Sequence, residues 1–386
     1  METASPKDVG IDPQRLERFF EVVDEKVRDR WLFGGAFLLA RRGRIVAARG
    51  VGETAPGRRA RPDDVFCLFS TTKPLAATLL LMKIDQGAVR LVDRVADYIP
   101  EFAANGKASI TVAHALTHTG GFPTLPPDWA MPHWGDWDGT IARLCAQPLE
   151  FEPGTAVQYH ALTQSWIQAE IARRVDGGRR GFAQMCAEEL FRPLGMKDTH
   201  LGVRPDLRER RVPLRALDQG GAPFPMEFLE AFNAPEAQAA AVPGAGAYST
   251  VFDLARFYQM WLNGGELDGV RVLSPAMVEL ATTIHTGDMP DRFFDMICVP
   301  KGWPRTPANR GLGFWIRGAG VFAPSVFGSL ASPRTFGHPG ASSIMAWADP
   351  VRDLVFVNLA TGLIEEWRHI LRTHLLSDLA QSCVVD

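Results

Sequence analysis

The sequence lacks the features that would place the chain in a membrane or on nucleic acid. Its longest apolar stretch, residues 74–84, is interrupted by Lys83 and is too short to span a bilayer. The first fourteen residues carry four charged side chains and no apolar core of a secretory signal. No run of Lys or Arg could follow a phosphate backbone, and the formal net charge is -3. We therefore expect a cytoplasmic protein with neither a membrane nor a nucleic acid as partner.

Cysteine is also sparse, and metal-type and phosphate-type motifs are missing. The 5 cysteines are odd in number and widely spaced, which favours buried thiols over a disulfide framework. His114 and His118 could share one helical face, but no third ligand is suggested nearby, so we expect no metal. Residues 244–248 are glycine-rich but lack the lysine of a phosphate-binding loop, so they predict a tight turn. We expect no cofactor.

The chain does have enough apolar residues for a large core. It has 386 residues, of which 46% are hydrophobic, so two domains or one composite domain can form. Apolar runs on either side of Arg42-Gly43 predict a hairpin near the N-terminus, and three further short runs predict strands near the C-terminus. These strands are 313–316, 343–348 and 354–359.

Helical patterns occupy most of the region between the predicted strands. Residues 12–30 and 365–379 predict helices beside the terminal strands, and apolar spacing predicts the inner helices 75–86, 164–175, 182–190, 251–262 and 275–282. We therefore predict an α+β fold whose antiparallel sheet is built from both chain ends and carries flanking helices. Residues 8–68 and 306–386 would form this sheet domain, and residues 69–305 would form an inserted, mainly helical domain.

Ser70-Thr-Thr-Lys73-Pro74 is a candidate nucleophile and base. If a helix begins at or just after Ser70, Lys73 lies one turn further on the same face and its amine can reach the serine hydroxyl. Pro74 is tolerated in a first turn, where backbone N–H groups have no helical acceptor. The helix N-terminus and burial would both lower the lysine pKa. The alternative is a solvated helix face, which such spacing often forms.

Two further observations favour the catalytic interpretation. Ser70 is the only serine with a lysine three residues later. The chain also contains no Gly-x-Ser-x-Gly, which excludes the nucleophile elbow of α/β-hydrolases as the rival serine mechanism.

Five short segments span most of the chain: Phe-Ser-Thr-Thr-Lys-Pro at 69–74, Ala-Leu-Thr-His-Thr-Gly-Gly at 115–121, Glu-Pro-Gly-Thr at 152–155 with Tyr159, Ser-Thr-Val-Phe-Asp-Leu-Ala at 249–255, and Phe-Gly-His-Pro-Gly at 336–340. Their order resembles that in the class C β-lactamases and their esterase relatives, especially family VIII-type carboxylesterases and related transesterases. The resemblance implies a β-lactamase/penicillin-binding-protein-like fold with its active site at the domain interface.

The resemblance also implies a proton-handling role for Tyr159, one of only 4 tyrosines. In the family, the tyrosine of a Tyr-x-Asn element stands beside the serine and lysine. Here Ala161 replaces the asparagine, so its contacts must be supplied otherwise. The alternative for Tyr159 is a partly buried hydroxyl that anchors a loop.

The third element of the family is Lys-Thr-Gly on an edge strand, and this chain has His338-Pro339-Gly340. The resemblance implies an oxyanion hole made by the backbone N–H groups of Ser70 and Ala341. Histidine in place of lysine removes a permanent cation, which argues against strong recognition of a penicillin-type carboxylate. His338 could bind substrate or tune Tyr159, although an ordinary strand-end histidine is the alternative.

Three segments are unusually aromatic: 122–137, 224–232 and 293–303. Such segments either pack on the core or cover a site, and we expect them to cover the site as loops. Together with the resemblance, this makes His338, Gly340, His160 and Trp134 the predicted substrate-binding residues. An aromatic cover implies an apolar group in the substrate.

These observations predict a serine carboxylesterase that acts on a small-molecule ester through an acyl-enzyme. Transfer of the acyl group to an alcohol or amine is the main alternative. A β-lactamase or D-Ala-D-Ala peptidase, or a non-catalytic binding protein of the same fold, fits the residues less well. The sequence leaves the oligomeric state open.

Overall fold

A computed structural model describes residues 1–124, 135–217, 226–320, 324–341 and 343–386. Its main sheet has the strand order β3-β2-β1-β12-β11-β10-β9. The strands are β1 (Gly34–Arg41), β2 (Arg44–Ala55), β3 (Arg58–Arg59), β9 (Trp315–Ile316), β10 (Phe336–Gly340), β11 (Ile344–Asp349) and β12 (Leu354–Thr361). The N-terminal β1 pairs antiparallel with the C-terminal β12. The predicted antiparallel sheet built from both chain ends is thus confirmed.

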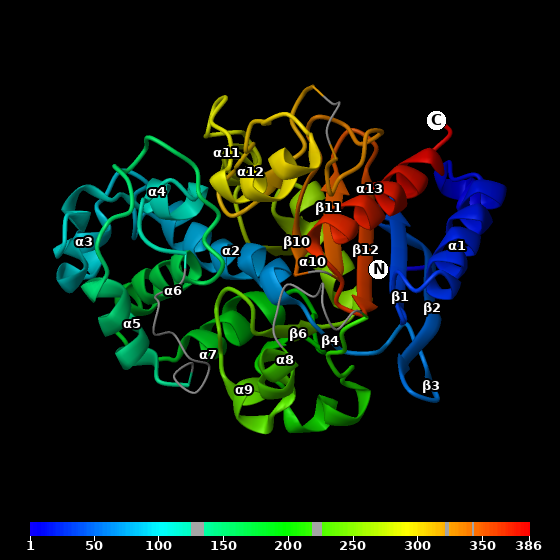
Figure 1. The fold of residues 1–386 in the computed structure, drawn as a ribbon, viewed down its shortest axis with the longest axis horizontal. Coiled ribbons are helices and arrows are strands. Elements are labelled where there is room, and N and C mark those ends of the chain that lie inside the picture. The colour runs from blue at the N-terminus through cyan, green and yellow to red at the C-terminus, as the bar shows by residue number, and fades with distance from the viewer. Residues whose placement is uncertain (125–134, 218–225, 321–323, 342) are drawn as a thin grey trace.

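Helices cover both faces of this sheet (Figure 1). Side chains alternate along β1: Phe37 and Leu39 belong to the hydrophobic cluster that includes α1 (Pro13–Arg28) and α13 (Glu366–Ser382). Ala36, Leu38 and Ala40 belong to a second cluster that includes α10 (Val251–Leu262), which packs against β1, β11 and β12. The period of two along the strand separates the two layers.

The region between β3 and β9 is mainly helical, as the sequence predicts. Helices α3 to α6 lie to one side of the sheet, whereas α10 covers one of its faces (Figure 1). Its helices are α2 (Thr72–Asp85), α3 (Val95–Tyr98), α4 (Val112–Thr117), α5 (Trp137–Ala146), α6 (Thr163–Val175), α7 (Phe182–Cys186), α8 (Met226–Asn233), α9 (Pro235–Ala239), α10, α11 (Pro275–Ala281) and α12 (Arg292–Cys298). One small sheet has the strand order β4 (Phe66–Cys67), β6 (Ala247–Ser249) and β5 (His200–Leu201). Another consists of β7 (Glu266–Leu267) and β8 (Val270–Arg271). Within the described ranges, no helix has the length and apolarity needed to cross a bilayer.

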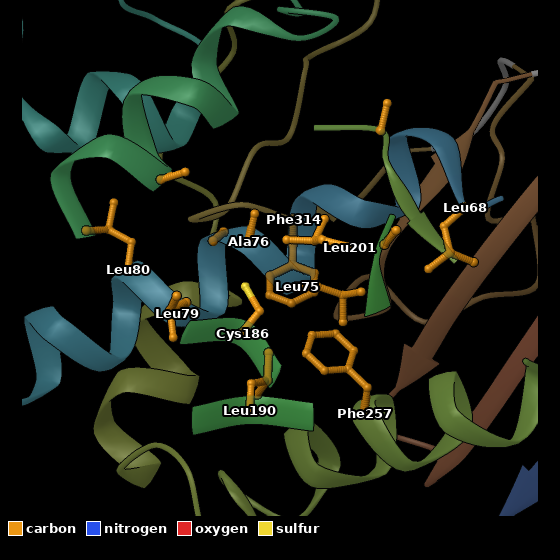
Figure 2. Packing of buried hydrophobic residues seen from close by; sticks show 14 of the residues in the cluster. Leu68, Leu75, Ala76, Leu79, Leu80, Cys186, Leu190, Leu201, Phe257 and Phe314 are labelled. Atoms are coloured by element: carbon orange, nitrogen blue, oxygen red, sulfur yellow. The ribbon is translucent and has the colours of Figure 1, made fainter. Parts of the chain in front are cut away.

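Helix α2 carries the predicted nucleophile region through the centre of the molecule. Every side chain from Thr72 to Lys83 is buried, which is typical of a helix enclosed on all sides. Figure 2 shows Leu75, Ala76, Leu79 and Leu80 of α2 packed among side chains of other elements, including Phe257 of α10. This enclosure gives the N-terminus of α2 a rigid support.

Two of the three aromatic segments differ from their predicted form. Residues 226–233 and 292–298 are the short helices α8 and α12, where the sequence predicts loops. Helical spacing inside such short segments was obscured by their proline-rich flanks. In the first segment Trp137 begins α5 and packs against Trp166 with ring centroids 4.6 Å apart, so it belongs to the core. The turn at 243–245 leads into strand β6, which the sequence analysis did not predict.

Candidate active site

Ser70 lies on a short 3-10 helix, Phe69–Thr71, that leads directly into α2. Phe69 has a φ of +45°, a left-handed conformation that bulky residues seldom adopt and that recurs at functional sites. Its ring packs against Phe232 of α8 at 5.6 Å. The turn is tied to β6 on both sides, because Leu68 N–H donates to Ala247 O at 2.8 Å and Ala247 N–H donates to Thr72 Oγ1 at 3.1 Å. The half-buried Ser70 is therefore held in a fixed turn.

The structure brings Lys73 to Ser70, with Nζ 3.1 Å from Oγ. Two main-chain carbonyls also contact the amine: Ala161 O at 2.6 Å and Gly244 O at 3.1 Å. A neutral amine has two N–H donors and one lone pair, so it can donate to both carbonyls and accept the Ser70 proton. The main-chain oxygen of Ala161 thus supplies a lysine contact at the position where the family has asparagine.

Burial determines the charge of Lys73. The side chain is 3% exposed, and the loss of water lowers its pKa from 10.5 to about 7. A substantial fraction of the amine is therefore neutral at physiological pH. This is the protonation state that a general base requires.

Tyr159 lies in the segment before α6 and completes the group around Ser70. Its phenol lies close enough to the Ser70 hydroxyl for Ser70 to affect its pKa, and Lys73 Nζ lies 5.1 Å from the centre of its ring. Burial is the largest influence and raises the pKa of Tyr159, while the interaction with the Ser70 hydroxyl lowers it in part. The phenol is consequently neutral in the resting protein, so it can donate a proton while Lys73 accepts one.

Four rings surround Tyr159 and restrict its orientation. Their centroids lie 4.9–5.9 Å from that of Tyr159, and the rings belong to His118, Phe293, Trp315 and His338. Phe293 comes from the third aromatic segment, so this segment does lie against the site.

His160 is fully buried and its ring nitrogens contact protein groups. Nε2 donates to Phe122 O at 2.8 Å, and Nδ1 lies 3.2 Å from His118 Nδ1. The backbone N–H of His160 also donates to His118 Nδ1 at 3.0 Å. Burial lowers the pKa of His160 to about 3, so it is neutral. His160 is thus buried among protein groups next to Tyr159 in the sequence. Its predicted contact with substrate stays a prediction.

His338 lies on β10 beside Trp315 and Tyr159 and is 1% exposed. Its Nδ1 donates to Pro339 O at 2.6 Å, which leaves Nε2 as an unprotonated acceptor that has no hydrogen-bond partner among the described residues. Burial lowers the pKa of His338 well below 6.5, so the ring carries no charge. On its outer side β10 pairs with β9 only at Phe336 and Gly337. His338 therefore lies beyond the residues that pair with β9, while it still pairs with Ala346 of β11.

The end of β10 packs against the nucleophile turn. Thr71 Oγ1 donates to His338 O at 3.0 Å, and a Cβ on Gly340 would lie 2.4 Å from Leu68 O. Only glycine permits this approach. Ala341, the predicted second oxyanion donor, directly follows Gly340 and is partly buried. Trp134 lies outside the described residues.

The sequence analysis missed a buried ion pair next to Tyr159. Asp291 and Arg310 are 2% and 3% exposed at their side chains and form a salt bridge, and Asp291 Oδ1 accepts the Tyr159 N–H at 3.2 Å. No local motif marks these residues, which lie far from Tyr159 in the sequence. Among the described residues, no group of His, Cys, Asp and Glu is arranged to hold a metal ion.

Comparison with known proteins identifies the family of the chain. The family model described as Beta-lactamase matches residues 19–381. The chain is 29% identical over 328 residues to the protein named Esterase/beta-lactamase LipL of Mycobacterium tuberculosis (strain ATCC 25618 / H37Rv), a match that covers 78% of this chain and 70% of LipL.

Two solved structures share the whole architecture. A penicillin-binding protein homologue from Caulobacter crescentus has a TM-score of 0.78 at 29% identity, and the match covers 97% of this chain and 99% of that one. A family VIII carboxylesterase has a TM-score of 0.77 at 28% identity, with coverage of 97% and 99%. The predicted β-lactamase/penicillin-binding-protein-like fold is confirmed.

Proposed function

This chain belongs to the β-lactamase family and is a serine hydrolase, and we propose that it acts as a carboxylesterase through an acyl-enzyme on Ser70. The observation that carries the proposal is the 3.1 Å contact between Ser70 Oγ and a buried Lys73 whose pKa is lowered to about 7. Esterase and carboxylesterase names among its relatives support ester hydrolysis.

Acylation begins when Ser70 Oγ attacks the ester carbonyl carbon and its proton passes to the neutral Lys73 amine. The carbonyl oxygen becomes an oxyanion, which the N–H groups of Ser70 and Ala341 would stabilise. When the C–O bond to the alcohol breaks, Tyr159 donates its phenol proton to the leaving oxygen and regains a proton from the Lys73 ammonium. The alcohol leaves, and the acyl group stays on Ser70.

Deacylation repeats these steps with water. Water attacks the acyl carbonyl and gives its proton to the Lys73–Tyr159 pair, and the bond between the acyl carbon and Ser70 Oγ then breaks. Ser70 recovers its proton, and the carboxylic acid is released. The resting protonation states, a neutral phenol and a partly neutral amine, are restored.

The surroundings of the site support a substrate with an apolar group and no essential carboxylate. Phe232 packs behind the nucleophile turn, and Phe293 packs on Tyr159. His338 is neutral and offers only an acceptor at Nε2, so it cannot make the charge-assisted hydrogen bond that a lysine would make to a carboxylate.

A labelling and turnover experiment tests the proposal. The protein should react with a fluorophosphonate probe and hydrolyse p-nitrophenyl esters of graded acyl length, with nitrocefin as the β-lactam comparison. Ser70→Ala should lose labelling and reduce ester turnover to background, since the mechanism passes through one oxygen. A folded Ser70→Ala protein that keeps more than a small fraction of activity would disprove it.

The same assay separates hydrolysis from acyl transfer. If an added alcohol or amine yields a new ester or amide at the expense of free acid, the acceptor competes with water and the enzyme is an acyltransferase. We propose hydrolysis as the main reaction and the cytoplasm as its location, the latter from the sequence pattern alone.

A further inference from the structure

Tyr159 lies outside regular secondary structure, so other contacts must hold its backbone. The segment from Val157 to His160 forms neither a helix nor a named strand. Gln158 N–H donates to His118 O at 3.0 Å, and His160 N–H donates to the His118 ring. The N–H between them, that of Tyr159, donates to Asp291 Oδ1 at 3.2 Å. Successive N–H groups are thus held from two different segments.

Asp291 is connected to the Tyr159 segment by more than this bond. Its Oδ1 also accepts the N–H of Phe293 at 2.9 Å and thereby caps α12. The next residue, Arg292, donates its N–H to Val157 O at 3.0 Å. Since α12 also supplies the Phe293 ring that packs on Tyr159, one carboxylate sets both the backbone and one side of the ring.

Arg310 contacts Trp315, another ring that packs on Tyr159. It pairs with Asp291 Oδ2 and donates to Ala308 O at 2.9 Å, and its guanidinium lies 4.0 Å from the centre of the Trp315 ring. The Trp315 ring meets Tyr159 edge-on at 5.6 Å. The pair is almost fully buried, so each charge depends on the other, and removal of one would leave an uncompensated charge.

We propose that Asp291 and Arg310 are positioning residues that fix the Tyr159 phenol against Ser70 and Lys73. Neither residue belongs to the proton pathway: Asp291 acts through the Tyr159 backbone and α12, and Arg310 acts through Asp291 and Trp315. The inference rests on the proposed function, because it requires Tyr159 to transfer a proton. Misplacing a reacting group by about 1 Å can lower a rate by about 100-fold.

A double-mutant cycle tests the inference with p-nitrophenyl butyrate as substrate. Asp291→Ala should lower kcat by about 10- to 100-fold with KM changed less than about twofold, because the phenol is displaced while the ester site persists. In the Tyr159→Phe background the same substitution should cost less than about twofold, since the group that it positions is already absent. A purely structural role would give the same factor in both backgrounds.

A conservative variant and a matched control complete the design. Asp291→Asn keeps an oxygen acceptor for the Tyr159 N–H but removes the charge. It should therefore lower kcat less than Asp291→Ala does, and again only when Tyr159 is present. It replaces Asp291→Ala in the cycle if that variant does not fold. Glu189→Gln breaks the partly buried ion pair with Lys83 at the far end of α2 and should leave kcat unchanged.

The outcomes separate the two proposals. If Tyr159→Phe leaves kcat unchanged, the proton role of Tyr159 fails, and with it the mechanism. If Tyr159→Phe lowers kcat but Asp291→Ala has no effect, or equal effects in both backgrounds, the positioning inference alone is overturned. If Asp291→Ala does not fold, the same criterion applies to Asp291→Asn.

Discussion

Lys73 shows how a single residue acquires its chemistry from its surroundings. On a solvated helix face the amine would stay protonated until about pH 10. Here burial lowers its pKa to about 7, and two main-chain carbonyls orient it toward Ser70. Because the base must be neutral, its active fraction rises as the pH rises through this value.

We therefore expect kcat/KM for an uncharged ester to increase with pH along an acid limb whose midpoint is near pH 7. The neutral histidines beside the site do not account for this limb, because burial lowers the pKa values of His118, His160 and His338. Rates measured from pH 5 to 9 with p-nitrophenyl butyrate check this. A profile that is flat down to pH 5 would contradict Lys73 as the base.

We propose that the identity of residue 338 governs substrate choice. A lysine at this position would offer a charge-assisted donor, which is worth about 1.5–3 kcal/mol. We expect His338→Lys to raise the ratio of kcat/KM for nitrocefin to that for the ester by about tenfold or more. The neutral His338→Gln serves as its control and should leave the ratio unchanged. Wild-type turnover of nitrocefin as fast as that of the best ester would show that the missing lysine does not govern selectivity.

At the scale of elements, the contact between β10 and the nucleophile turn aligns the two halves of the site. Gly340 lies so close to Leu68 that an added Cβ would be 2.4 Å from its carbonyl oxygen. The Thr71 hydroxyl is bonded to His338 O in the same strand. Any separation of strand and turn would move Ala341 away from Ser70.

Gly340→Ala should accordingly lower kcat/KM by at least about tenfold, because the oxyanion donors would no longer meet at one oxygen. Gly181→Ala is the matched control, since a Cβ there meets nothing within 4 Å. Steady-state rates and melting temperatures of both variants provide the measurement. Wild-type activity in Gly340→Ala would show that the strand end tolerates displacement.

The whole molecule contains several fully buried, neutral histidines, which links its stability to pH. Burial lowers the pKa values of His118, His160, His338 and His369. Between the ordinary value of 6.5 and each lowered value, the unfolded chain binds one proton more per histidine than the folded protein, so stability falls as the pH falls. Burial raises the pKa of Asp253 to about 6, so below that pH this carboxyl binds a proton in the folded protein first and its contribution to stability rises as the pH falls.

We expect the free energy of unfolding to decrease below pH 6.5 by up to about 1.4 kcal/mol per pH unit for each histidine. Urea unfolding at pH 7.5, 6.5, 5.5 and 5 measures the slope. His369→Gln, which removes one of these histidines on α13, should reduce the slope by about one proton. A stability that does not change from pH 7.5 to 5 would refute the expectation.

The sequence by itself determined the features that depend on neighbouring residues. Apolar periodicity predicted α10 with its observed bounds and the hairpin of β1 and β2, and the Ser-x-x-Lys spacing predicted the contact between Ser70 and Lys73. These features depend on distances within one helix or one hairpin, which local geometry sets. The order of motifs along the chain indicated the family, which the comparisons confirm.

Only the tertiary structure decided the features that join distant segments. Ala161 and Gly244 contact Lys73 through main-chain oxygens, which leave no trace in residue identity. Asp291 contacts the Tyr159 backbone across more than a hundred residues and pairs with Arg310. The aromatic segments that the sequence predicts as loops fold into α8 and α12. The physical reason is that burial and long-range packing set these contacts and pKa values, and no local pattern encodes which segments meet.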